Sequence, residues 1–114
     1  MKFTLLNLDG MTPSFDMALA GSPIRIGRRA GSDIRLDDES VSYFHCQIDE
    51  INGTLWIRDL GSANGIFVNG FNVAQSHLMP GDRLTVGTTS FRVEYERETQ
   101  GRSASREAEF VVAS

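Results

Sequence analysis

Residues 64–65 and residues 69–70 are both Asn-Gly pairs, and only three apolar residues, 66–68, lie between them. Asn-Gly is the strongest short-range signal for a tight turn, because both residues tolerate a positive φ angle. Two turns this close predict two loops that project from one edge of an antiparallel structure, since three residues leave no room for a long strand. Turn chemistry carries no function by itself, so these pairs constrain the fold and leave the function open.

The rest of the chain consists of short apolar and polar alternations that end at turn residues, and no window has the apolar stripe of an amphipathic helix. This pattern predicts strands at residues 3–8, 15–19, 24–26, 34–36, 45–51, 54–60, 71–73, 83–86 and 89–96. The polar stretch at 37–44 lacks helical periodicity, and we interpret it as a loop of functional length. Many short strands at close spacing indicate an all-β protein, a β-sandwich in which two sheets bury their facing sides.

The length of 114 residues suits one domain, which the strand pattern places at residues 1–96. Charged and small residues dominate 97–114, as in a flexible tail, and residues 110–112 could form an edge strand, a linker or a disordered end. Cys46 is the only cysteine, so we expect no disulfide framework and no cysteine metal cluster, and a reducing, cytoplasmic setting fits best. No apolar run reaches membrane-spanning length.

The net charge of −4 argues against general attraction to nucleic acid or to an anionic membrane. Residues 24–35 depart from this average, because they contain four arginines and one acid. The planar guanidinium group suits bidentate contacts to a carboxylate or a phosphate, so this segment is a candidate pocket for one specific anion. The alternative is an exposed strand face that the nearby acids neutralise. Arg25 and Arg35 alternate with apolar neighbours, and we expect them to face solvent.

Five short motifs follow one another along the chain: Ile-Gly-Arg at 26–28, Ser-Tyr-Phe-His at 42–45, Asp-Leu-Gly-Ser-Ala-Asn-Gly at 59–65, Val-Asn-Gly at 68–70 and Pro-Gly-Asp-Arg-Leu-Thr-Val-Gly at 80–87. In order and spacing they resemble the forkhead-associated (FHA) domain over about residues 24–96. The resemblance implies a sandwich of about eleven strands whose loops at one end bind phosphothreonine in a partner protein, downstream of a Ser/Thr kinase.

The resemblance also implies roles for single residues. Arg28 matches the phosphate-binding arginine of the family, and Ser42 matches the serine whose hydroxyl donates to the phosphate. Asn64 matches the asparagine that binds the peptide main chain, Asn69 lies at a second position that supports the loop or the ligand, and Ala63 is a further candidate peptide contact. A phosphothreonine brings close to two negative charges and three acceptor oxygens, so its reader needs donors at fixed positions.

Gly27, His45 and Gly65 match positions that support the site in the family. The family usually has Arg directly after the serine of the second motif, where this chain has Tyr43. A lost charge-assisted hydrogen bond costs roughly 1.5 to 3 kcal/mol, or about one to two decades of affinity. Arg29, or Tyr43 through its hydroxyl, is the candidate replacement in phosphate binding.

The same residues allow other assignments. Ser42, His45 and Asp59 are the residue types of a hydrolytic triad, but the serine lacks a nucleophile-elbow sequence. His45, Cys46 and His77 lack metal-site spacing, and there is no Gly-x-x-x-x-Gly-Lys phosphate loop. We therefore predict a non-enzymatic interaction module without a cofactor or a metal. Its main competitor is a module that keeps the sandwich and binds an unphosphorylated protein surface, which the tyrosine after the serine makes credible.

Overall fold

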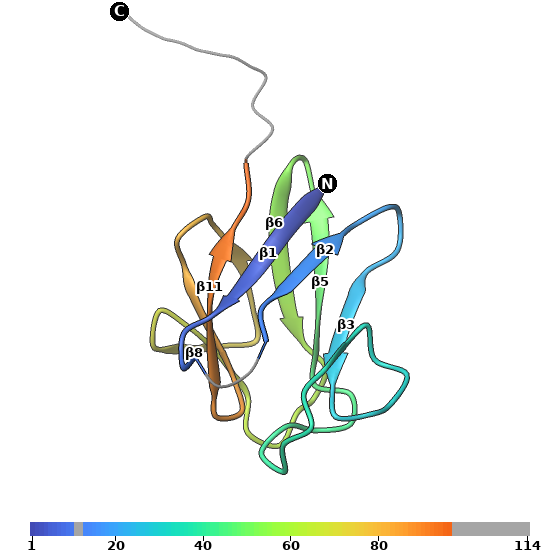
Figure 1. The fold of residues 1–114 in the computed structure, drawn as a ribbon, viewed down its shortest axis with the longest axis vertical. Helices are drawn as coiled ribbons and strands as arrows, with labels where there is room; N and C mark the ends of the chain where they lie inside the picture. The colour runs from blue at the N-terminus through green and yellow to red at the C-terminus, as the bar shows by residue number, and fades with distance from the viewer. Residues whose placement is uncertain (11–12, 97–114) are drawn as a thin grey trace, which may run out of the picture.

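The computed structural model describes residues 1–10 and 13–96. The predicted tail at 97–114 lies outside the described residues. In the described part, the chain forms eleven strands and no helix, which confirms the predicted all-β architecture (Figure 1). These residues therefore include no helix that is long and apolar enough to cross a membrane.

One sheet has six strands in the order β2-β1-β11-β10-β7-β8, and all neighbouring strands in it are antiparallel. Its strands are β1 (Lys2–Asn7), β2 (Phe15–Ala18), β7 (Ile66–Val68), β8 (Phe71–Val73), β10 (Arg83–Val86) and β11 (Thr89–Glu94). Because β1 pairs with β11, the first and last described strands meet inside this sheet.

The other sheet has five strands in the order β4-β3-β5-β6-β9. Its strands are β3 (Ile24–Gly27), β4 (Ile34–Arg35), β5 (Cys46–Ile51), β6 (Thr54–Asp59) and β9 (Gln75–Leu78). Strands β3 and β4 are parallel, whereas the other pairs are antiparallel. A parallel pair cannot be joined by a two-residue hairpin, so residues 28–33 between these strands form a longer loop.

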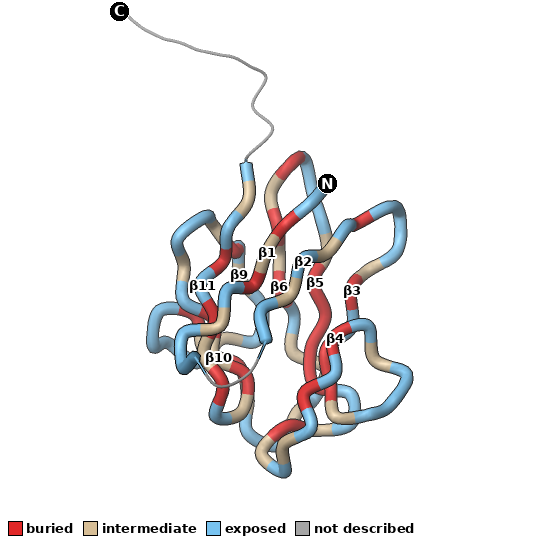
Figure 2. Tube along the Cα trace, viewed as in Figure 1, coloured by how far each residue is buried: buried red, intermediate tan, exposed pale blue. Residues whose placement is uncertain are grey.

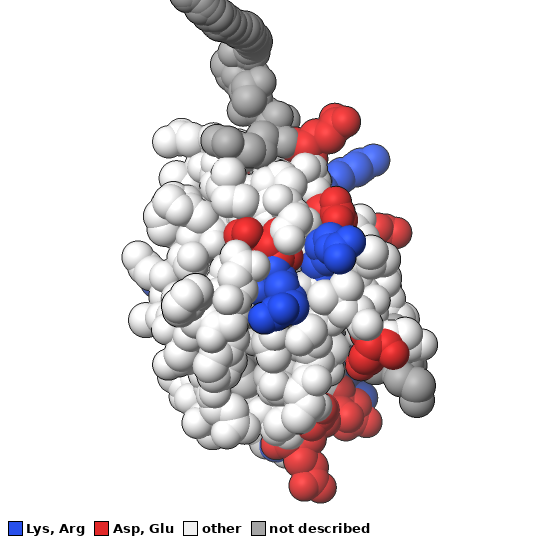
Figure 3. Space-filling model, turned by 90° about the vertical axis from the view of Figure 1, so that its left-hand side faces the viewer, with Lys and Arg blue, Asp and Glu red and all other residues white. Residues whose placement is uncertain are grey.

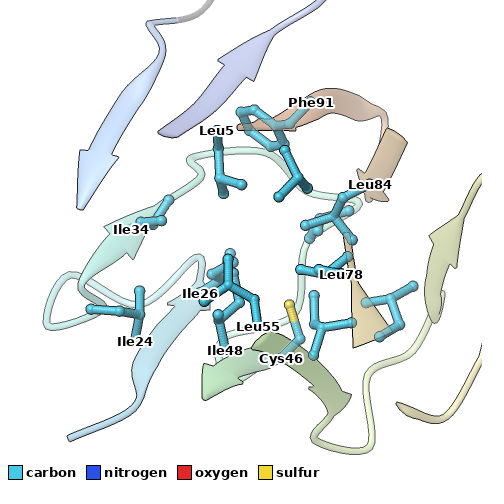
Figure 4. Close-up of a cluster of buried hydrophobic side chains, with 14 of the residues drawn as sticks. Leu5, Ile24, Ile26, Ile34, Cys46, Ile48, Leu55, Leu78, Leu84 and Phe91 are labelled. Carbon is cyan, nitrogen blue, oxygen red and sulfur yellow. The ribbon is translucent and has the colours of Figure 1, made fainter. Parts of the chain in front are cut away.

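The facing sides of the two sheets form one apolar core (Figures 2 and 4). Its most buried members come from both sheets: Leu5, Ile66, Leu84 and Phe91 from one, and Ile26, Ile34, Ile48, Leu55, Ile57 and Leu78 from the other. Burying a side chain of this size contributes about 1.5 to 3 kcal/mol, so the core gives the loops a rigid support. Cys46 belongs to this core, and burial raises the pKa of its thiol well above the usual range.

Strand β9 was not predicted from the sequence. Only Leu78 is buried in this strand, and its other side chains are polar, so the strand shows no apolar alternation. Among the described residues it is an edge strand that pairs only with β6. On that neighbour, Leu55 and Ile57 face the core, whereas Trp56 packs across the strands on His77 with ring centroids 4.0 Å apart.

The two Asn-Gly pairs lie at opposite ends of β7, so the prediction that their loops share one edge was wrong. Residues 69–70 form the hairpin turn between β7 and β8, with φ angles of 53° and 88°, and a type I′ turn requires positive φ at both positions. At residues 64–65 only the glycine has a positive φ, of 79°. This pair lies in the connection that carries the chain from β6 in one sheet to β7 in the other.

Candidate functional site

Three loops gather at one end of the sandwich, the lower end in Figure 1. They are residues 28–33 between β3 and β4, residues 36–45 between β4 and β5, and residues 60–65 between β6 and β7. Each loop carries one of the motif residues at positions 28, 42 and 64. The tertiary fold, and not nearness in sequence, therefore brings these side chains together.

Arg28 is fixed at the start of the first loop by two hydrogen bonds to the second loop. Its backbone N–H donates to the Ser42 carbonyl at 3.0 Å, and its Nε–H donates to the Val41 carbonyl at 2.9 Å. Its guanidinium carbon also lies 4.3 Å from the centroid of the Tyr43 ring. Within the described residues, its two Nη groups make no hydrogen bond or ion pair, so they are available to an external anion.

Ser42 connects the second loop to the third. Its Oγ accepts a hydrogen bond from the Ala63 backbone N–H at 3.0 Å, and its own backbone N–H donates to Nδ1 of His45 at 3.0 Å. The Ser42 hydroxyl donates to no acceptor in the described part of the chain. A hydroxyl that is positioned by an accepted bond and still able to donate suits the phosphate contact that the resemblance implies.

His45 is fully buried beneath these loops. Because its Nδ1 accepts from the Ser42 N–H, the hydrogen-bond pattern assigns the ring proton to Nε2, which lies 2.8 Å from the Gly65 carbonyl oxygen and donates to it. The imidazole ring thus joins the second loop to the third, as expected for a residue that supports the site.

Gly27 ends β3 where the second loop passes directly over it. A Cβ at this position would overlap with the carbonyl group of Tyr43 and lie 3.2 Å from the Ser32 hydroxyl oxygen. Gly65 is restricted in a similar way, since its φ is positive and a Cβ would lie 2.6 Å from the side-chain nitrogen of Asn72. Gly27 thus permits the close approach of the second loop, whereas Gly65 provides a positive φ and leaves room for the Asn72 side chain of β8.

Asn64 closes the site from the third loop. Its Nδ2 donates to the Ser40 carbonyl at 2.8 Å, and the side chain is exposed. In the part of the chain that the structure describes, its Oδ1 accepts no hydrogen bond. The amide is therefore oriented by one bond and retains an acceptor and a donor for the main chain of a bound segment.

A second network, absent from the sequence prediction, supports the second loop. The Asp38 carboxylate accepts from the N–H and the hydroxyl of Ser40, both at 2.8 Å, and from the Thr88 hydroxyl at 2.6 Å. These hydrogen bonds, that of Thr88 foremost, lower the pKa of the Asp38 carboxyl group. Asp-x-Ser is typical of a local turn around the aspartate, but nothing in the sequence pairs it with a threonine fifty residues further along.

Asp59 shapes the third loop. One carboxylate oxygen accepts from the N–H groups of Gly61 and Ser62, both at 3.1 Å, and the other accepts from the Ser62 hydroxyl. The Ser62 Oγ in turn accepts from the Gly65 N–H at 2.9 Å. The Asp59 carboxylate at the end of β6 is thus occupied by the third loop and, among the described residues, does not bond to His45.

The contacts of these residues do not form a hydrolytic triad. The His45 ring contacts the backbone of Ser42 and not its hydroxyl. The described residues also contain no group of three His, Cys, Asp or Glu side chains that could hold a metal ion.

Four residues were predicted to contact the ligand or support its loop through motif order: Arg28, Ser42, Asn64 and Asn69. Of these, the structure places Asn69 away from the other three. Its Nδ2 donates to a carboxylate oxygen of Asp82 at 3.0 Å, and its Oδ1 accepts from the Arg83 N–H at 2.9 Å. These contacts fix the turn at the far end of β7. The structure therefore gives Asn69 a bracing position for the scaffold and does not bring it to Arg28, Ser42 or Asn64.

Two exposed aromatic residues follow Ser42, and two arginines of the first loop lie on them. Tyr43 is 59% exposed and Phe44 is 57% exposed. Arg28 lies over the first ring, and Arg29 lies over the second with its guanidinium carbon 5.2 Å from the centroid. Arg35 is exposed as expected, and its Nε–H donates to the Arg28 carbonyl at 3.0 Å.

The sequence model of the FHA domain matches residues 24–87, which is more than half of the chain. The chain therefore belongs to the FHA domain family. Among solved structures, the FHA domain of a Chlamydia trachomatis protein superposes with a TM-score of 0.74 at 32% identity, over 84% of this chain and 99% of that domain. An FHA domain from a structural and functional analysis of phosphothreonine-dependent FHA domain interactions superposes with a TM-score of 0.75 at 29% identity, over 84% and 98%.

Among curated relatives, the glycogen accumulation regulator GarA of Mycolicibacterium smegmatis is 39% identical over 61 residues, which cover 54% of this chain. The match spans only 39% of the length of that relative. The similarity therefore covers only part of each protein.

Proposed function

We propose that this chain is a phosphothreonine-dependent protein-interaction module that acts downstream of a Ser/Thr kinase. The observation that carries the proposal is the convergence of Arg28, Ser42 and Asn64 from three loops. Each side chain is fixed by a neighbouring loop, and each has hydrogen-bonding capacity that the described residues do not use. The phosphothreonine dependence named for one of the similar FHA domains supports it.

The chemistry of the ligand fits these groups. A phosphothreonine side chain carries nearly two negative charges at neutral pH and three acceptor oxygens. The Nη groups of Arg28 can donate charge-assisted hydrogen bonds to it, and the Ser42 hydroxyl can donate a further one. Asn64 is then placed to bind the main chain beside the phosphorylated residue. Because the three loops are already tied together, we expect little backbone movement on binding.

Tyr43 changes how the phosphate group would be held. In this chain the residue after the serine stacks on Arg28 where the family usually has an arginine. Such a cation–π contact is worth about 0.5 to 1 kcal/mol at an exposed site, so it restricts the Arg28 side chain without adding a donor of its own. We therefore expect Arg28 and Ser42 to provide most of the hydrogen bonds to the phosphate group.

A second candidate is an FHA-fold module that binds an unphosphorylated protein surface. The exposure of both Tyr43 and Phe44 favours it, since adjacent exposed aromatic side chains are common at protein interfaces. The two candidates differ in one respect, which is whether binding depends on the phosphate.

The experiment is capture of a degenerate phosphothreonine peptide library by the whole chain, beside the same library without phosphate and beside the Arg28→Ala variant. Capture of phosphorylated peptides alone, lost in the variant, is the expected result. Equal capture of both libraries would reject phosphothreonine dependence in favour of the second candidate.

A further inference from the structure

The turn between β10 and β11 lies at the same end of the sandwich as the three loops (Figure 1). It consists of Gly87 and Thr88, which belong to none of those loops. A Cβ at Gly87 would overlap with the Ser40 hydroxyl oxygen and would lie 2.7 Å from a methyl carbon of Val41. The turn therefore lies directly against the second loop.

Thr88 makes two hydrogen bonds to the second loop. Its backbone N–H donates to Ser40 Oγ at 3.1 Å, and its hydroxyl donates to one carboxylate oxygen of Asp38 at 2.6 Å. The other Asp38 oxygen accepts from the N–H and the hydroxyl of Ser40, both at 2.8 Å. Ser40 is thus held between the Asp38 carboxylate and the turn.

The carbonyl groups of Ser40 and Val41 orient two residues of the candidate site. The Ser40 carbonyl accepts from Nδ2 of Asn64 at 2.8 Å, and the Val41 carbonyl accepts from Nε of Arg28 at 2.9 Å. Because the two carbonyls are consecutive, a rotation of the backbone at Ser40 would displace both acceptors. The hydrogen bonds that hold Ser40 restrict this rotation.

The same hydrogen bonds engage an acid of the second loop. On the face shown in Figure 3, acidic groups gather toward the lower end of the molecule, where the three loops lie. A carboxylate beside a phosphate-binding arginine would compete with the phosphate for its donors. Both Asp38 oxygens are taken up by Ser40 and Thr88, and within residues 1–10 and 13–96 Asp38 makes no ion pair with Arg28.

We propose that Thr88 is a positioning residue of the phosphothreonine site. Through the second loop it fixes the two carbonyls that orient Arg28 and Asn64 before a ligand arrives. The inference rests on the proposed function. Thr88 need not contact the bound peptide, because it acts by reducing the ordering of the loops that binding would otherwise require.

Two substitutions at Thr88 and a matched control test this role. Thr88→Val keeps the shape of the side chain and removes its hydroxyl, whereas Thr88→Ser keeps the hydroxyl. The control is Thr85→Val. The Thr85 hydroxyl lies in the same hairpin and shares a hydrogen bond of 2.8 Å with the Ser90 hydroxyl, and in the described part of the chain it makes no hydrogen bond to the three loops.

Isothermal titration with a phosphothreonine peptide captured from the library measures the effect on affinity. We expect Thr88→Val to bind about fivefold more weakly than wild type, a typical size for the loss of one hydrogen bond. Thr88→Ser should bind within about twofold of wild type. Thr85→Val should bind like wild type, although it also loses a hydrogen bond of the hairpin.

A second measurement uses the free protein. In its NMR spectra, the Nε–H signal of Arg28 and the side-chain amide signals of Asn64 report on the hydrogen bonds to the two carbonyls. We expect these signals to shift in Thr88→Val and to return close to their wild-type positions in Thr88→Ser. A substitution that affects only the stability of the hairpin should leave them in place, as we expect for Thr85→Val.

The outcomes separate the inference from the proposed function. Wild-type affinity in Thr88→Val, or Arg28 and Asn64 signals that stay in place in that variant, overturns the inference and leaves the phosphothreonine site standing. An equal loss of affinity in Thr88→Ser or in Thr85→Val would also overturn it. Failure of the wild-type chain to bind any phosphopeptide overturns both. Weaker binding and shifted signals in Thr88→Val alone support the positioning role.

Discussion

An Asn-Gly pair lies at each end of β7, but the two asparagine side chains differ in the hydrogen bonds they make. At the hairpin end, the Asn69 side chain uses its amide nitrogen on Asp82 and its oxygen on the Arg83 backbone. At the loop end, Asn64 uses only its nitrogen within the described part of the chain, on the Ser40 carbonyl. Asn-Gly therefore marks a bend in both places, and the use made of the asparagine side chain distinguishes scaffold from candidate binding surface.

The residues around the two turns also differ in how far their hydrogen-bonding groups are satisfied. At the hairpin end the asparagine is satisfied within the domain and its backbone adopts the positive φ that the turn needs. At the loop end, Arg28 and Ser42 also have donors that bond to none of residues 1–10 and 13–96, beside loops that are already tied to one another. Substitutions at the loop end should therefore lower affinity, and those at the hairpin end should lower stability.

The largest expected effect is that of Arg28→Ala on phosphopeptide affinity. The loss of two charge-assisted hydrogen bonds, at roughly 1.5 to 3 kcal/mol each, should weaken binding at least about a hundredfold. Isothermal titration measures the loss, and a retained cooperative unfolding transition shows that the variant is folded. A folded variant that binds normally would refute the assigned site.

Asn64→Ala should have the next largest effect. We expect roughly a tenfold loss of affinity, since one or two hydrogen bonds to the peptide main chain are removed at about 1 kcal/mol each. Titration with the same phosphopeptide checks this. Unchanged affinity would mean that the Asn64 side chain makes no stabilising hydrogen bond to the peptide.

Asn69→Ala should give the opposite pattern. It removes two side-chain hydrogen bonds and places a Cβ residue with no local hydrogen bond at a positive φ, so we expect a loss of about 1 to 2 kcal/mol in unfolding free energy. Phosphopeptide affinity should not change. Asn69→Gly is the matched control, because it keeps the backbone geometry and removes only the side chain. A loss of affinity in the folded variants would bring Asn69 into the binding site.

The pH dependence of binding should be weaker than these effects. The second pKa of a phosphate monoester is near 6, so affinity should decline several-fold as pH falls from about 7.5 to about 5.5 and the dianion takes up a proton. Titrations across this range measure the decline. A flat profile would count against recognition of the dianion.

The smallest effect concerns the network at Asp38. Hydrogen bonds lower the pKa of this carboxyl group below its ordinary value of 3.8. The carboxylate therefore stabilises the fold fully above that ordinary value, and this stabilisation is lost as pH falls through the lowered pKa. We expect unfolding free energy to fall less steeply below about pH 4 in Asp38→Asn than in wild type. Equal slopes of unfolding free energy against pH in the two proteins would show that the Asp38 carboxylate does not stabilise the fold.

The sequence predicted the sandwich because its inward-facing residues alternate, and apolar alternation is a local property. It missed β9, because Leu78 is the only buried residue in that edge strand. It grouped the two Asn-Gly turns at one edge, because three residues leave no room for a long strand, whereas residues 66–68 form the short strand β7 and the turns lie at its two ends.

For the site residues too, local motifs were predictable and tertiary contacts were not. Arg28, Ser42 and Asn64 were assigned through motif order, and the structure brings them together. The separation of Asn69, the contact of Asp38 with Thr88 and the stacking of Arg29 on Phe44 all depend on which loops meet. Such contacts are tertiary, and no local pattern encodes them.

The most direct test of the central claim is a titration of the isotope-labelled chain with a phosphothreonine peptide, followed by backbone amide NMR. We predict that the amide signals of residues 28–29, 42–44 and 63–65 shift, while those of residues 69–70 and 82–83 stay in place. The unphosphorylated peptide should shift none of them. Equal shifts with both peptides, or shifts centred on the hairpin end of β7, would contradict the assignment of the three loops as a phosphate-dependent binding surface.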